Sequence, residues 1–168
     1  MYEIGRQFLY GGHGVCRIIG LEVMRSGKGK ATYYVLEPVE QPGTKFFVPV
    51  ENDAAVAKLR PLLTREELLE LLHCDRVRNY PWIKDEGQRK LRFRELITSG
   101  DREALMGMIG ALLRHKAALT AAGRKFHLSD ENFLHDAQKL LNAEFAQVFD
   151  LKPQEVNGFI QQELENTH

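Results

Sequence analysis

Short apolar runs separated by glycine-containing turns make up the first sixty residues of the chain. The runs are rich in Val, Ile, Tyr and Phe, which favour β-strands, and lie at residues 7–10, 14–24, 31–39 and 45–50. The turn signals between them lie at residues 11–14, 26–29 and 41–43. Short strands joined by tight turns predict a small antiparallel barrel or a curled sheet.

The pattern changes to a helical one after residue 60. Thr64 and Glu67 form a capping-box signature, which predicts a helix start. Pro81 suits the first turn of a longer helix, predicted to run to about Thr98. Further helices are predicted over residues 102–121, from about 129, and from about 153 to 164. The chain is therefore predicted to be α+β, with one domain at residues 1–60 and a second, all-α domain at residues 61–168.

The charge is distributed unevenly along a chain whose formal net charge is zero. Residues 73–128 hold twelve basic and six acidic side chains, whereas residues 129–168 hold two basic and eight acidic ones. The apolar share of 43% and the charged share of 27% are those of a globular protein. We therefore expect the middle of the chain to attract anionic partners and its last forty residues to repel them.

Nothing in the sequence predicts a membrane segment or a secreted protein. No apolar run approaches the length of about 18 residues that a spanning helix needs. The opening residues lack the pattern of a signal peptide, and Cys16 and Cys74 do not form a disulfide framework. A cytoplasmic protein without a membrane partner is the expectation.

Catalytic, metal and cofactor sites are not predicted either. The six histidines are scattered, and the chain lacks HxxxH, HExxH and CxxC spacings. No GxSxG motif is present, and the glycine-rich loop at 11–14 is interpreted as a turn with positive φ angles rather than as a phosphate loop. We expect no cofactor, no small-molecule substrate and no enzyme activity.

A basic segment at residues 76–94 is the main candidate for a functional site. It holds seven basic and two acidic residues, together with Trp82, the only tryptophan of the chain. Basic side chains neutralise phosphates, and an aromatic ring can wedge between bases. Alternatively, a helix at 100° per residue would place Trp82 on the same buried face as Phe93 and Leu96. The pattern alone leaves both interpretations open.

Three segments together resemble the CarD/CdnL family of bacterial RNA polymerase-binding transcription regulators. They are FLYGGHGVCRI at residues 8–18, YYVL at 33–36 followed by FFVPVE at 46–51, and RFRELITSGD at 92–101. The resemblance implies a Tudor/SH3-like barrel that binds the polymerase β subunit, a kind of domain also carried by the transcription-repair coupling factor. It also implies a helical domain that contacts the minor groove and backbone of promoter DNA beside the −10 element, where a tryptophan wedges at the edge of the melted bubble.

The sequence departs from the family pattern at the wedge. The position thirteen residues before Ser99, where the family pattern has its tryptophan, holds Glu86. Trp82 lies four residues earlier, about 6 Å along a helix axis. The side chains proposed from the resemblance to contact DNA are Trp82, Arg89, Lys90 and Arg92, and those proposed to contact the polymerase are Arg25, Lys45 and Phe47.

The predicted function is thus that of a transcription regulator that binds polymerase and promoter DNA and stabilises the open complex. The alternative is an interaction module that binds polymerase or a repair factor without touching DNA. An enzyme with an unrecognised site is a third hypothesis, for which no motif gives support.

Overall fold

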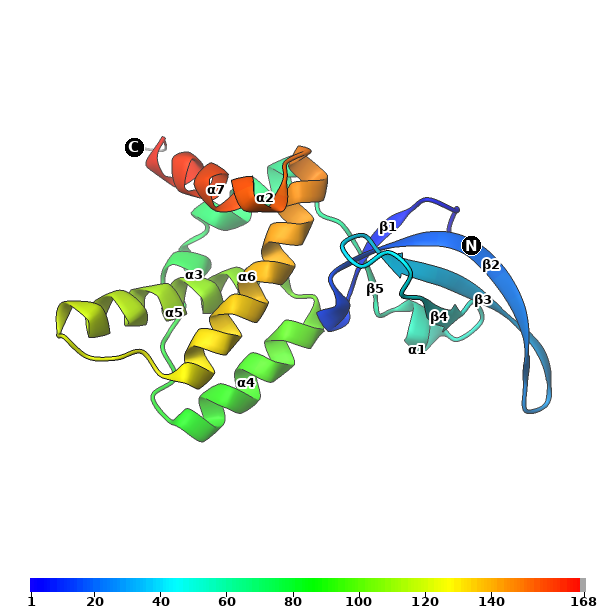
Figure 1. The fold of residues 1–168 in the computed structure, drawn as a ribbon, viewed down its shortest axis with the longest axis horizontal. Coiled ribbons are helices and arrows are strands. Elements are labelled where there is room, and N and C mark those ends of the chain that lie inside the picture. The colour runs from blue at the N-terminus through cyan, green and yellow to red at the C-terminus, as the bar shows by residue number, and fades with distance from the viewer. Residues whose placement is uncertain (167–168) are drawn as a thin grey trace. The chain divides into compact units, whose positions relative to one another are not determined.

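The computed structural model describes residues 1–166 and divides into two compact units. The first unit comprises Met1–Leu62, and the second begins at Leu63 (Figure 1). The first unit holds the strands and the second holds all the longer helices, so the predicted α+β class is confirmed.

The first unit is built on a five-stranded antiparallel sheet with the order β4-β3-β2-β1-β5. Its strands are β1 (Gln7–Tyr10), β2 (Val15–Ser26), β3 (Gly29–Pro38), β4 (Phe46–Pro49) and β5 (Leu59–Pro61), with the short helix α1 (Asp53–Val56) before β5. In the part of the chain that the structure describes, the edge strands β4 and β5 do not pair with each other. The closed barrel of the prediction is therefore not confirmed.

The core of the sheet unit forms from residues that are far apart in the sequence. A β-bulge between Ile18 and Gly20 shifts the β2–β3 register, and beyond it the two strands continue as a curved ribbon past the end of β4 (Figure 1). Gly14 has a φ of 76°, as the predicted turn requires. Burial raises the pKa of the Cys16 thiol to about 11, which keeps this thiol protonated and unreactive. The buried core side chains are Phe8, Cys16, Ile18, Leu36, Tyr34, Val48 and Leu59.

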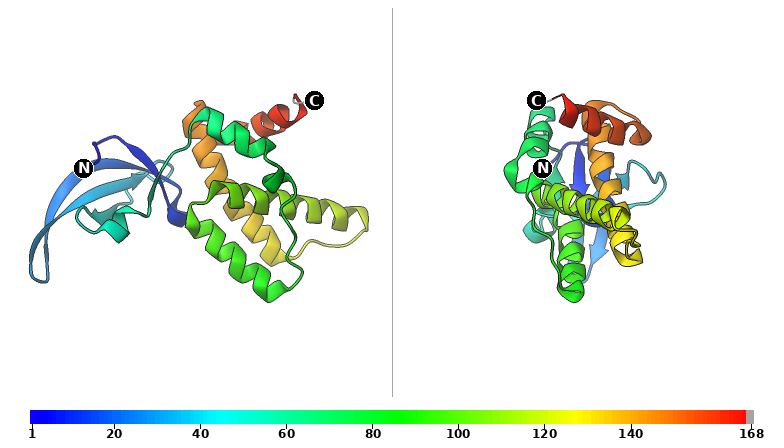
Figure 2. Two further views of the ribbon diagram at one scale, coloured as in Figure 1. Left: turned by 180° about the vertical axis from the view of Figure 1, so that it is seen from behind. Right: turned by 90° about the vertical axis from the view of Figure 1, so that its left-hand side faces the viewer.

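The second unit contains helices and, among its described residues, no strand. Its long helices α4, α5 and α6 pack on one another, and α2 and α7 pack against α6 (Figure 2). The capping box predicted at Thr64 and Glu67 is present, with both of its hydrogen bonds formed. The elements are α2 (Arg65–His73), α3 (Asp75–Arg78), α4 (Glu86–Ser99), α5 (Arg102–Ala121), α6 (Leu128–Phe149), the 3-10 turn η2 (Pro153–Glu155) and α7 (Val156–Glu165).

The prediction that a helix begins at Pro81 is wrong. Helix α4 begins at Glu86, where the Asp85 carboxylate accepts a hydrogen bond of 2.8 Å from the amide of Gln88. The carbonyls of Ile83 and Lys84, which a longer helix would use internally, accept hydrogen bonds from a side chain instead. Residues 79–85 therefore form a non-helical segment between α3 and α4.

One glycine of α5 fixes where this segment lies. A Cβ atom at Gly107 would overlap the ring of Tyr80, and the carbonyl of Tyr80 accepts a 3.0 Å hydrogen bond from the Arg114 guanidinium. Tyr80 is thus held closely against α5, and Trp82 follows two residues later.

Within residues 1–166, no helix has the combination of length and apolar character needed to span a bilayer.

Candidate nucleic-acid interface

Trp82 lies in the segment before α4 and packs against the helical core. Its ring stacks on the imidazole of His115 from α5, with ring centres 3.9 Å apart and an angle of 13° between the planes. The ring also makes an edge contact with Phe93 of α4, at 6.4 Å. The side chain is therefore half-buried and held in one orientation, rather than projecting freely into solvent.

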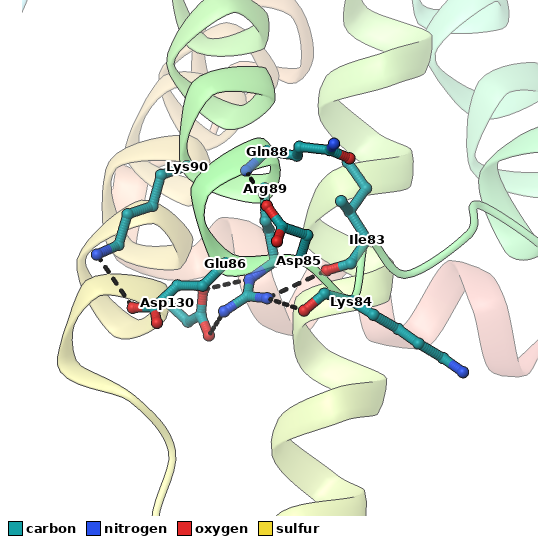
Figure 3. Close-up of polar contacts among 8 residues, drawn as sticks. All are labelled: Ile83, Lys84, Asp85, Glu86, Gln88, Arg89, Lys90 and Asp130. Carbon is teal, nitrogen blue, oxygen red and sulfur yellow. Dashed lines mark hydrogen bonds and ion pairs between the residues drawn. The ribbon is translucent and has the colours of Figure 1, made fainter.

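The buried side chain of Arg89 holds the backbone of residues 83–84 in place. Its guanidinium donates two hydrogen bonds to the Asp130 carboxylate, from Nε at 3.0 Å and from Nη2 at 3.1 Å (Figure 3). Its Nη1 donates to the carbonyls of Ile83 and Lys84, at 3.1 and 3.3 Å. The guanidinium carbon lies 4.7 Å from the centre of the Trp82 ring, a cation–π distance. The Arg89 side chain therefore holds the backbone that follows Trp82 and also packs against the Trp82 ring.

This geometry argues against the expectation that Arg89 contacts DNA. Only 4% of the residue is exposed, and Asp130 is fully buried. A guanidinium whose charge is already matched by a buried carboxylate does not reach a phosphate unless that pair breaks. In a helix, Arg89 lies within about 40° of Trp82, on the same face as Phe93 and Leu96. This spacing is the feature of the sequence that indicates the burial of Arg89.

Lys90 and Arg92, by contrast, lie at the surface of α4. The Lys90 ammonium pairs with Glu86 at 3.0 Å, and Arg92 pairs with Glu95 at 3.4 Å. The hydrogen bond and charge of Lys90 lower the pKa of the Glu86 carboxyl. Exposed pairs of this kind contribute little stability, so both cations are available to exchange their partners for phosphates.

A cavity of about 440 Å³ lies beside Trp82. Its basic side chains, apart from Arg89, come from two segments that lie far apart in the sequence: Lys84 precedes α4, and Arg124 and Lys125 belong to the connection between α5 and α6. The aromatic, basic and histidine side chains that line it, apart from Arg89, are Trp82, Lys84, His115, Arg124, Lys125 and His127. The charge count of residues 73–128 included these cations, but nothing in the sequence indicated that they surround one space.

His115 makes the stability of this region depend on pH. Burial lowers the pKa of His115 below its ordinary value of 6.5; the nearby Asp130 carboxylate opposes this, while Arg89 and His127 add to it. A histidine that takes up a proton less readily when folded contributes stability above pH 6.5 that is lost as the pH falls through the lowered pKa.

We expect the melting temperature to fall between pH 7 and pH 5, and to fall less in His115→Gln. The matched control is His135→Gln, at an exposed position of α6; equal pH profiles for wild type and His115→Gln would contradict the assignment.

The three polymerase-contact candidates are not brought together into one patch. Phe47, on the edge strand β4, is 41% exposed, and the exposed Lys45 precedes the same strand. Phe47 pairs with Val35, whereas Arg25 pairs with Lys30 near the tip of the β2–β3 ribbon. Lys30 and Val35 are five positions apart on β3, roughly 16 Å along the strand. Lys45 and Phe47 can thus share a contact that Arg25 does not reach.

Metal ligands do not gather anywhere in residues 1–166, where no three His, Cys, Asp or Glu side chains come together as a metal site would need. Cys74 contacts the Glu103 carboxylate at 3.5 Å, which is a pairwise contact only.

In a comparison with known protein families, residues 2–62 match the CarD-like/TRCF RID domain. A comparison with curated proteins found no match to the chain. The matched residues coincide with the sheet unit and stop where the helical unit begins. The N-terminal unit of this protein is therefore a CarD-like/TRCF RID domain.

Proposed function

We propose that the protein is a non-enzymatic transcription regulator that binds RNA polymerase through its RID domain and promoter DNA through its helical unit. The observation that carries the proposal is the family match, because it covers one compact unit almost from end to end and belongs to an interaction domain rather than to a catalytic one. The β subunit is proposed as the polymerase partner because of the sequence resemblance.

The edge strand β4 supports the proposed polymerase contact. In the described sheet it pairs only with β3, so its outer backbone groups are not used by the sheet and are the proposed site for a strand from a partner. Added strands gain affinity from main-chain hydrogen bonds and specificity from neighbouring side chains. The exposed Phe47 and Lys45 are placed to supply that specificity.

Truncation of Phe47 tests this contact. In Phe47→Ala, the affinity for RNA polymerase is expected to fall about tenfold or more, because a partly exposed aromatic ring at an interface is a typical hot spot. Val23→Ala is the matched control, since Val23 is 62% exposed and lies on β2 rather than on the edge strand. Equal polymerase pull-down by the two variants would contradict the edge-strand assignment.

Two features of the helical unit support the proposed DNA contact. Lys90 and Arg92 present exchangeable positive charge on α4, and Trp82 is held rigidly before that helix by His115 and Arg89. An apolar wedge stabilises an unstacked base step, and a polymerase-tethered domain makes a weak contact effective. We infer that open-complex stabilisation arises from this combination.

Trp82 and its stacking partner provide a matched pair of variants. Trp82→Ala and His115→Ala each remove half of one stacked pair, and each is expected to lower the free energy of unfolding by about 2 kcal/mol, less than full burial would cost. Only Trp82→Ala is expected to shorten the lifetime of the polymerase–promoter open complex. If both variants shorten it equally, the effect comes from lost packing and the wedge role is excluded.

A polymerase-binding module without DNA contact is the second candidate function. The observation in its favour is that Trp82 packs against Phe93 and the helical core, as a structural residue does. A nuclease-footprinting experiment with polymerase and forked promoter DNA separates the two functions, because only a DNA-contacting regulator alters the footprint beside the −10 element.

A further inference from the structure

We propose that the cavity beside Trp82 binds a phosphate group. Three segments contribute to it: Lys84 comes from the residues before α4, Arg124 and Lys125 come from the connection between α5 and α6, and His127 lies at the start of α6. The cavity, at about 440 Å³, falls in the size range of small-ligand sites, and most of its polar lining is cationic or imidazole.

The positive charge of this cavity is not neutralised by the fold. Its acidic lining residue, Glu86, is already paired with Lys90 at 3.0 Å. Across residues 1–166, Lys84, Arg124 and Lys125 take part in none of the ion pairs, and Figure 3 shows the Lys84 side chain pointing away from the Arg89–Asp130 pair. Like charges gathered around one space repel one another, and a bound anion removes that repulsion.

The local structure holds the connection in place before any ligand binds. Helix α5 ends at Ala121, and Gly123 takes the left-handed conformation, with a φ of 69°, that reverses the chain. Phe126 packs against the helical core, and its ring centre lies 6.2 Å from that of His115. Arg124 and Lys125 are thus carried on a short loop anchored on both sides, which reduces the ordering cost of binding.

The arrangement favours phosphate over a carboxylate ligand. A carboxylate is satisfied by one guanidinium, as Asp130 is by Arg89. Phosphate presents several charged oxygens in different directions, which suits cations that approach from separate segments. The phosphate has two possible sources, the backbone of a nucleic acid or a small free phosphate compound. The first source rests on the proposed DNA contact, and the second does not.

Trp82 supplies a direct readout, because it is the only tryptophan of the chain and lines the cavity. The full chain is titrated with sodium pyrophosphate and, separately, with a double-stranded oligonucleotide, each at constant ionic strength, while Trp82 emission is recorded. A saturable change in emission is expected. In the double variant Arg124→Gln/Lys125→Gln, the dissociation constant is expected to rise about tenfold or more. Lys139→Gln is the matched control, because Lys139 lies on the exposed surface of α6, and its dissociation constant is expected to stay unchanged.

The two ligands distinguish the sources of the phosphate. A loop-dependent response to pyrophosphate supports a free phosphate compound, one to the oligonucleotide supports the nucleic-acid backbone, and a response to both supports a general phosphate site. No saturable response to either ligand, or equal affinities for wild type and the loop variant, overturns the proposal. Because the pyrophosphate titration contains neither polymerase nor DNA, its failure is distinct from a failure of the proposed function.

Discussion

Replacing Arg89 with methionine is expected to lower the free energy of unfolding of the helical unit by about 3–5 kcal/mol. Methionine replaces the aliphatic stem of arginine but has neither its charge nor its N–H donors, so the buried Asp130 carboxylate would lose the two hydrogen bonds that compensate its burial. The carbonyls of Ile83 and Lys84 would lose their donor as well. Denaturant unfolding followed by circular dichroism measures the loss.

Arg92→Met is the control for this prediction, because Arg92 is an exposed arginine on the same helix. It is expected to change stability by no more than about 0.5 kcal/mol. The double variant Arg89→Met/Asp130→Leu is expected to recover much of the loss, since it removes both charges instead of leaving one unpaired. A loss below about 1 kcal/mol for Arg89→Met alone would show that the pair is not a structural support.

The second large effect is expected at Glu144, whose carboxylate is buried in α6. It accepts hydrogen bonds from Arg102, from Nε at 3.0 Å and from Nη2 at 2.9 Å, and from the backbone amide of Leu63 at 3.1 Å. Glu144→Ala removes the carboxylate with which the buried Arg102 guanidinium pairs and is expected to cost about 3–5 kcal/mol of stability. Hydrogen exchange at the Leu63 amide is expected to accelerate at the same time.

Glu131 provides a comparison on the same helix. Its ion pair with Lys116, at 3.1 Å, has nearly the same length, but its side chain is 47% exposed. Because surface pairs contribute about 0–1 kcal/mol, Glu131→Ala is expected to have a small effect. Similar losses for Glu131→Ala and Glu144→Ala would contradict the importance of burial.

Local signals in the sequence predicted those features that neighbouring residues determine. The capping box of Thr64 and Glu67 formed because both of its hydrogen bonds span three residues. The start of α4 was mispredicted because a side chain that pairs 41 residues away, with Asp130, also binds the carbonyls before the helix. Strand β5 was missed because it is three residues long and includes Pro61.

The candidate site shows the same division between local and distant information. Helical spacing contained the evidence for the burial of Arg89, yet its charge alone suggested an exposed position. Lys84 and Lys125 line one cavity although forty-one positions separate them in the sequence. Their proximity depends on how α4, α5 and α6 pack, which periodicity does not specify.

The hydrogen bond between Leu63 and Glu144 also has a consequence for how the chain folds during synthesis. All the strand pairings of the RID domain lie within residues 7–61, so its sheet can form as soon as that stretch has left the ribosome. The first residue of the helical unit, in contrast, is fixed by a carboxylate 81 residues later. While the intervening residues are being translated, the start of the helical unit remains untethered, and a nascent-chain protease experiment would find cleavage near residue 63 until Glu144 emerges.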